Sequence, residues 1–103
     1  MPNYVFAYTG GKMAETDAER EAAMAAWGSF MGGLGDSIVD AGNPFGPAAT
    51  AGASGVTPGA SSQLTGYSII SAASLDEATA KTKGCPVLTQ GGSVEVHEII
   101  PVM

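Results

Sequence analysis

Apolar residues alternate with smaller or polar residues in several short stretches of the chain. The first stretch has Tyr4, Phe6 and Tyr8 at every second position and ends at a glycine pair. Alternation of this kind, with aromatic and β-branched residues before a turn signal, is typical of a strand. The pattern predicts four strands, near residues 3–9, 48–54, 66–73 and 93–100.

Two other stretches have the pattern of helices. Thr16-Asp17-Ala18-Glu19 matches a capping box and opens an alanine-rich segment. Ser74-Leu75-Asp76-Glu77 is a second capping box, and Gly84 is a natural residue to end that helix. In the first helix the large apolar residues recur at spacings of three and four, which predicts one buried stripe of Met24, Trp27, Phe30, Met31, Leu34 and Ile38.

The order of these elements is β-α-β-β-α-β, which predicts an α+β, ferredoxin-like domain with an antiparallel sheet over residues 1–103. We expect the small side chains of Val5, Ala7 and Thr9 to lie under the first helix, whose glycines would allow a close approach to the sheet. The aromatic face of the first strand would then point away from the helices. An exposed stripe of this kind usually marks an interface, so we expect a homodimer.

Composition and charge narrow the possible partners. The 103-residue chain has 4 basic and 10 acidic residues and a net charge of −6, which disfavours binding to nucleic acids or to anionic membranes. Residues 41–75 carry no charge, but repeated glycines and prolines argue against a membrane span. A lone Cys85 and the absence of a signal-like start favour a cytoplasmic protein.

Four stretches resemble the YCII-related family, also known for the DGPF domain. They are residues 4–8, residues 27–36, residues 66–70 with 73–78, which include the sequence SLDEA, and residues 85–86 with 91–96, which have the sequence GGSVEV. The resemblance implies a dimeric α/β barrel, in which two ferredoxin-like sheets face each other. It also implies that some members are enzymes with a His–Asp pair whose histidine lies in the first helix. Here Trp27 is the prominent aromatic residue of that helix, and the Asp-Gly-Pro-Phe motif is absent.

His97 and Glu95 are the candidate catalytic residues. His97 is the only histidine, and it shares a strand face with Glu95 two residues earlier, so the two could act as an acid–base pair or form a polar pair on an edge strand. Tyr8, Tyr67 and Trp27 are candidate ligand-binding residues, because aromatic rings with polar groups suit a small molecule inside a barrel. The residues predict no metal site and no cofactor.

These observations favour a small homodimeric binding or assembly module. The alternative is a small-molecule enzyme of the dimeric-barrel type, an isomerase or a cofactor-free oxygenase, that uses His97 and the barrel tyrosines. The uncharged loop at residues 42–65 either packs across the mouth of the barrel or onto a partner, with Phe45 as its anchor, or forms an exposed connector.

Overall fold

The computed structural model describes residues 1–11, 14–60 and 62–102. Its main sheet has four strands in the order β2-β5-β1-β6, and every neighbouring pair is antiparallel. These strands are β1 (Asn3–Thr9), β2 (Ile38–Asp40), β5 (Leu64–Ser71) and β6 (Ser93–Ile99). The helices are α1 (Asp17–Leu34) and α2 (Leu75–Ala80), with short 3₁₀ segments η1 (Gly35–Ser37) and η2 (Pro86–Gln90). A separate hairpin consists of β3 (Ala49–Gly52) and β4 (Gly55–Pro58).

The strand order confirms the ferredoxin-like α+β fold, but the second strand of the sheet differs from the prediction. That strand is β2, which begins at Ile38 and pairs with β5, whereas the segment predicted near residues 48–54 belongs to the separate hairpin. Ile38 therefore lies outside the helix, at the start of β2. The cause is Gly35, whose backbone at φ 53° ends α1 before the apolar spacing does.

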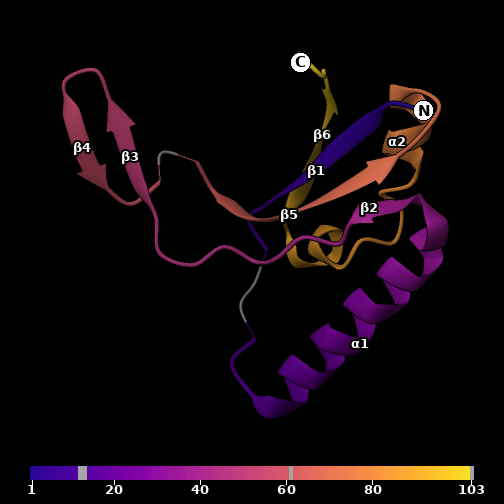
Figure 1. The fold of residues 1–103 in the computed structure, drawn as a ribbon. Coiled ribbons are helices and arrows are strands. Elements are labelled where there is room, and N and C mark those ends of the chain that lie inside the picture. The colour runs from indigo at the N-terminus through magenta and orange to yellow at the C-terminus, as the bar shows by residue number, and fades with distance from the viewer. Residues whose placement is uncertain (12–13, 61, 103) are drawn as a thin grey trace.

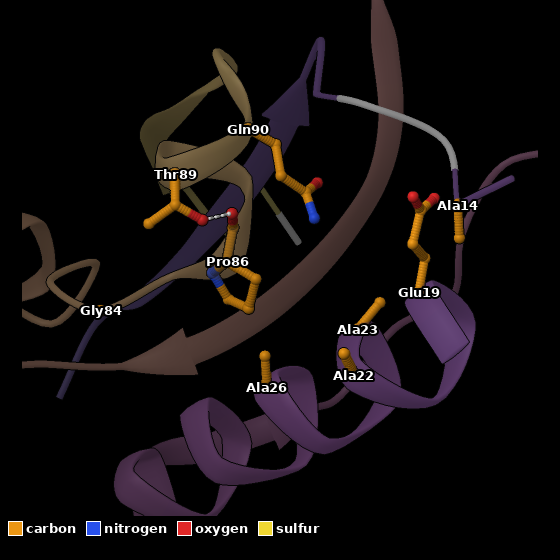
Figure 2. Close-up of a pocket in the computed structure, with 9 residues that line it drawn as sticks. All are labelled: Ala14, Glu19, Ala22, Ala23, Ala26, Gly84, Pro86, Thr89 and Gln90. Carbon is orange, nitrogen blue, oxygen red and sulfur yellow. Dashed lines mark hydrogen bonds between the residues drawn. The ribbon is translucent and has the colours of Figure 1, made fainter. Parts of the chain in front are cut away.

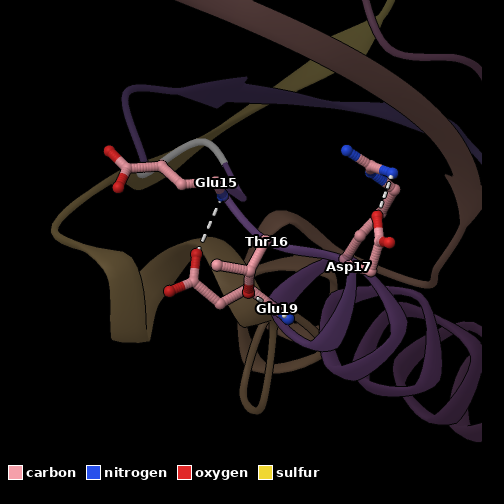
Figure 3. Close-up of polar contacts among 5 residues, drawn as sticks. Glu15, Thr16, Asp17 and Glu19 are labelled. Atoms are coloured by element: carbon pink, nitrogen blue, oxygen red, sulfur yellow. Dashed lines mark hydrogen bonds and ion pairs between the residues drawn. The ribbon is translucent and has the colours of Figure 1, made fainter.

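Both predicted capping boxes form. At the start of α1, Thr16 Oγ1 accepts a hydrogen bond from the backbone N–H of Glu19 at 3.1 Å, and the Glu19 carboxylate accepts one from the N–H of Glu15 (Figure 3). Ser74 and Glu77 repeat this arrangement at α2. These contacts satisfy amide groups that have no partner within the helix, so they fix where each helix begins.

The aromatic residues of β1 point toward the helices, which overturns the predicted orientation. Tyr4, Phe6 and Tyr8 are buried in the core with Phe30 and Leu34 of α1, while Val5, Ala7 and Thr9 are only half-buried on the opposite face. The physical reason is the composition of α1. Half of its residues are Ala, Gly or Ser, so the sheet supplies many of the large side chains that fill the space between the layers.

The predicted close approach of the α1 glycines to the sheet is also wrong. Apart from the backbone of α1 itself, no atom of the described residues lies within 4 Å of the position that a Cβ would occupy at Gly28, Gly32 or Gly33. Gly42 is different, because a Cβ there would collide with the Tyr67 carbonyl group, and its backbone has φ 76°. Only glycine allows the chain after β2 to run this close to β5.

The other side of the sheet is open. Register places Val5 and Ala7 of β1 beside Ile69 and Tyr67 of β5 on one side, and beside His97 and Glu95 of β6 on the other. We call these six residues the open face. Four of these residues are half-buried, Glu95 and His97 are exposed, and Phe45 stacks on Tyr67 at one corner of the face.

The β3–β4 hairpin extends away from the rest of the chain (Figure 1). All of its strand residues except Thr50 are exposed, and Val56 is 71% exposed. Phe45 is 48% exposed and stacks on Tyr67, with its backbone N–H bonded to the Thr65 carbonyl oxygen. The base of the predicted loop is thus attached to β5, whereas the hairpin does not cover the sheet.

Substitution of Phe30 by Ala tests the assignment of the core. Phe30 is buried against Trp27, so we expect Phe30→Ala to lower the free energy of unfolding by about 3–5 kcal/mol. Met24 lies on the same helix but is 70% exposed, so Met24→Ala should change stability by less than about 0.5 kcal/mol. Urea denaturation followed by circular dichroism measures both variants, and equal effects would contradict this core.

Candidate ligand pocket

A hollow of about 500 Å³ lies between the end of β1, the middle of α1 and the chain that follows β2. We call it the Tyr8 pocket. Its described lining combines apolar and hydroxyl-bearing residues, among them Tyr8, Trp27, Met31, Thr65, Ser68 and Val87. None of the described lining residues is charged. A volume of this order suits a small organic ligand.

Trp27 and Tyr8 form the aromatic wall of the pocket. Their ring centroids are 4.9 Å apart with an interplanar angle of 74°, and Trp27 makes a second edge contact with Phe30. Edge-to-face packing of this kind fixes the orientation of both partners. The Trp27 ring therefore packs against Phe30 of the core and also lines the pocket.

Two hydrogen bonds hold the polar corner of the pocket. The Tyr8 hydroxyl donates to Ser68 Oγ at 2.8 Å, and Ser68 Oγ donates to the Ala41 carbonyl oxygen at 2.7 Å. Ser68 is completely buried, so these two hydrogen bonds give its hydroxyl the partners that a buried polar group needs. Burial raises the pKa of Tyr8 to about 12, although the hydrogen bond with Ser68 opposes the increase. Tyr8 is consequently neutral at physiological pH.

Tyr67 also lines the pocket, but it belongs to the open face. Its hydroxyl donates to Asp40 Oδ2 at 3.3 Å, and its ring stacks on Phe45 at a centroid distance of 5.9 Å. The three candidate ligand-binding residues Tyr8, Trp27 and Tyr67 thus lie around one hollow. Tyr8 and Trp27 form its wall, while Tyr67 marks its border with the open face.

His97 and Glu95 lie elsewhere. His97 Nε2 is 2.9 Å from Glu95 Oε1, and the two side chains are 61% and 59% exposed. Both are on β6, an edge strand of the sheet, and neither is among the lining residues of the Tyr8 pocket. The structure therefore forms the predicted pair but does not bring it together with Tyr8 or Trp27.

A second hollow of about 380 Å³ lies between the first half of α1 and η2 (Figure 2). Alanines form its helical side, and Glu19 and Thr89 are among its few polar residues. Both already have partners, because Glu19 caps α1 and Thr89 Oγ1 donates to the Pro86 carbonyl oxygen. This hollow therefore offers less specific chemistry than the Tyr8 pocket.

Within residues 1–11, 14–60 and 62–102, no group of three or more His, Cys, Asp and Glu side chains is arranged to hold a metal ion. Cys85 is buried, and burial raises the pKa of its thiol, so it is a structural residue in the core. In the same part of the chain, no helix has the length and apolarity needed to cross a membrane.

Ser68 and Ala41 are two of the pocket residues that sequence reasoning missed. Ser68 alternates with Gly66 and Ile70 on the buried face of β5, and a serine at a buried position signals a hydrogen-bond partner. That partner is partly the Ala41 carbonyl group, which is positioned by the bend at Gly42. An alanine carries no sequence signal for such a contact.

Together, the strand order and the packing of the helices define a ferredoxin-like α+β protein with an apolar pocket between its sheet and its long helix. The model of the YCII-related domain matches residues 4–103, and the chain belongs to this family. Comparisons with curated proteins and with solved structures gave no significant match.

The ionisation of Tyr8 is directly measurable. Because its pKa is about 12 in the folded protein and 10.0 without perturbation, its folded neutral form contributes stability that is intact below about pH 10 and is lost as the pH rises toward about 12. At about pH 11, an unperturbed phenol would be roughly nine-tenths ionised and Tyr8 roughly one-tenth. The difference in phenolate absorbance between wild type and Tyr8→Phe should therefore be small at this pH and should become large in urea. A full phenolate signal from the folded protein would contradict the burial of this hydroxyl.

Proposed function

We propose that this protein is a small homodimeric module that binds a largely apolar small molecule in the Tyr8 pocket. The observation that carries the proposal is the position of the pocket, where Trp27 and Tyr8 form an aromatic wall beside a buried hydroxyl corner. Ligand sites in proteins commonly combine apolar walls with a few fixed polar groups. The dimer and the ligand are separate parts of the proposal, and each has its own test.

The open face supports the proposal of a homodimer. Its centre consists of Val5, Ala7 and Ile69, which are half-buried, whereas Glu95 and His97 lie toward one edge. An apolar centre with a polar border is typical of a protein interface. The occupant that we propose is a second copy of the chain, because a twofold axis would bring the apolar centre of one open face against the apolar centre of the other.

An enzyme that uses His97 and the barrel tyrosines has less support. The His97–Glu95 pair lies outside the Tyr8 pocket, so no single described hollow contains the pair and the buried tyrosine. The raised pKa of Tyr8 also keeps its phenol from acting as a base near neutral pH. A binding role needs neither group to transfer a proton. We further propose a cytoplasmic location, which the free and buried thiol of Cys85 supports.

Ligand binding is tested with a naphthalene-based probe. We expect 2-naphthol to bind the wild-type protein, and Trp27→Ala to weaken this binding by at least about tenfold because the pocket loses its aromatic wall. Met24→Ala is the matched control, since Met24 lies one turn earlier on α1 and outside the lining. Isothermal titration calorimetry measures the affinities, and circular dichroism confirms that the variants are folded. Equal affinities of wild type and Trp27→Ala, or no binding to wild type, would contradict the pocket.

The dimer is tested by light scattering at micromolar concentration. Wild type should have twice the mass of one chain, and Ile69→Glu should shift the protein to the monomer because it places a charge in the apolar centre of the interface. Met24→Glu adds the same charge to an exposed position of α1 and should leave the dimer intact. A monomeric wild type, or a folded Ile69→Glu protein that is still dimeric, would show that the open face is not the interface.

A further inference from the structure

The hydroxyl groups around the Tyr8 pocket have fixed directions. The carbonyl oxygen of Ala41 can only accept a hydrogen bond, so the Ser68 hydroxyl must donate its proton to it. Ser68 Oγ has no second proton, and it therefore accepts the proton of the Tyr8 hydroxyl. One backbone carbonyl thus sets the direction of both hydrogen bonds.

A third hydroxyl near the pocket is committed in the same way. Thr65 Oγ1 donates to the Tyr8 carbonyl oxygen at 3.2 Å, and Thr65 is one of the lining residues. The protons of Tyr8, Ser68 and Thr65 therefore all point to acceptors within the protein. What these hydroxyls have left for a ligand is the lone pairs of their oxygens.

The buried position of this corner makes its polarity important. Tyr8 is 5% exposed and Ser68 is fully buried, so water has little access to compensate a mismatched ligand group. Trp27, Asn43 and Gln90 also line the pocket and carry N–H donors, but they lie at half-buried or exposed positions where water competes. The selective contact is therefore the one at Tyr8 Oη.

We infer that the Tyr8 pocket selects apolar molecules that carry a hydroxyl or N–H donor, and that this donor binds to Tyr8 Oη. The inference rests on the proposed function, because it concerns the ligand of the same pocket. A ligand that presents only an acceptor to Tyr8 Oη would place its own lone pair against the lone pair of that oxygen. Ligands of the same size and shape should consequently differ in affinity according to whether they carry a proton to donate.

Three probes with one ring system test this preference. 2-Naphthol has a hydroxyl donor, 2-methoxynaphthalene has an oxygen without a proton, and naphthalene has no polar group. Wild type should bind 2-naphthol at least about tenfold more tightly than 2-methoxynaphthalene, as expected for one hydrogen bond formed in a desolvated site. Tyr8→Phe should remove this preference and leave the affinity for naphthalene unchanged within about twofold. Isothermal titration calorimetry measures each affinity.

A separate substitution, Ser68→Ala, tests the direction of the hydrogen bonds. Ser68→Ala removes the acceptor of the Tyr8 proton and frees that proton for the ligand, so the preference for 2-naphthol over 2-methoxynaphthalene should fall to about twofold or less. Ser71→Ala is the matched control, because Ser71 lies on the same strand and bonds instead to the Ser37 carbonyl oxygen. The control should keep the wild-type preference.

The outcomes separate the two levels of the proposal. If wild type binds all three probes with equal affinity, the pocket stands and the donor preference is wrong. A preference that survives in folded Tyr8→Phe would also overturn the inference, because another group would then receive the donor. If none of the probes binds, the proposed function itself fails.

Discussion

The contacts of Tyr8 connect the sheet, the long helix and the chain that follows β2. The ring packs edge-to-face on Trp27, the hydroxyl donates to Ser68, and the carbonyl oxygen accepts from Thr65. One residue of β1 thereby contacts α1 and two positions of β5, and through Ser68 it is linked to the chain after β2. Because half of the residues of α1 are Ala, Gly or Ser, the size of the Tyr8 ring helps to set the spacing between helix and sheet. The pocket is the space that remains beside it.

The two faces of the sheet therefore have different surroundings. The face with Tyr4, Phe6 and Tyr8 forms the core and one wall of the pocket, whereas Val5, Ala7 and Ile69 lie on the open face, where we propose that a second copy binds. A ligand in the Tyr8 pocket and a second copy on the open face would therefore not compete for the same side chains. Tyr67 is the exception, because it stands at the border of both regions.

Local sequence signals predicted the helices and strands of this fold better than they predicted how these elements pack. The capping boxes at Thr16 and Ser74 form as expected because each depends only on residues within four positions of one another. The side of β1 that meets the helix was mispredicted, since alternation defines two faces but does not say which face the helix covers. The short strand at Ile38 was also missed, because its apolar spacing continues that of the helix and Gly35 alone marks the boundary.

The candidate site shows the same division. Trp27, Tyr8 and Tyr67 were recognised by their aromatic side chains, and the structure places them around one hollow. The hydrogen bonds that give this hollow its polarity depend on the contact between residues 41 and 68, which are far apart in the chain. Their meeting depends on the close approach at Gly42, and no local pattern reveals it.

The attachment of the β3–β4 hairpin has a consequence for how the chain can change over evolutionary time. Phe45 and Thr65 are bonded to each other through their backbones, and Pro44 pairs with Gly66, so the two ends of the intervening segment are already fastened side by side. The strands between them contribute no buried side chain to the core. Insertions or deletions here leave the paired ends in place, so this arm is where the domain can acquire new length, or a new peptide, without refolding.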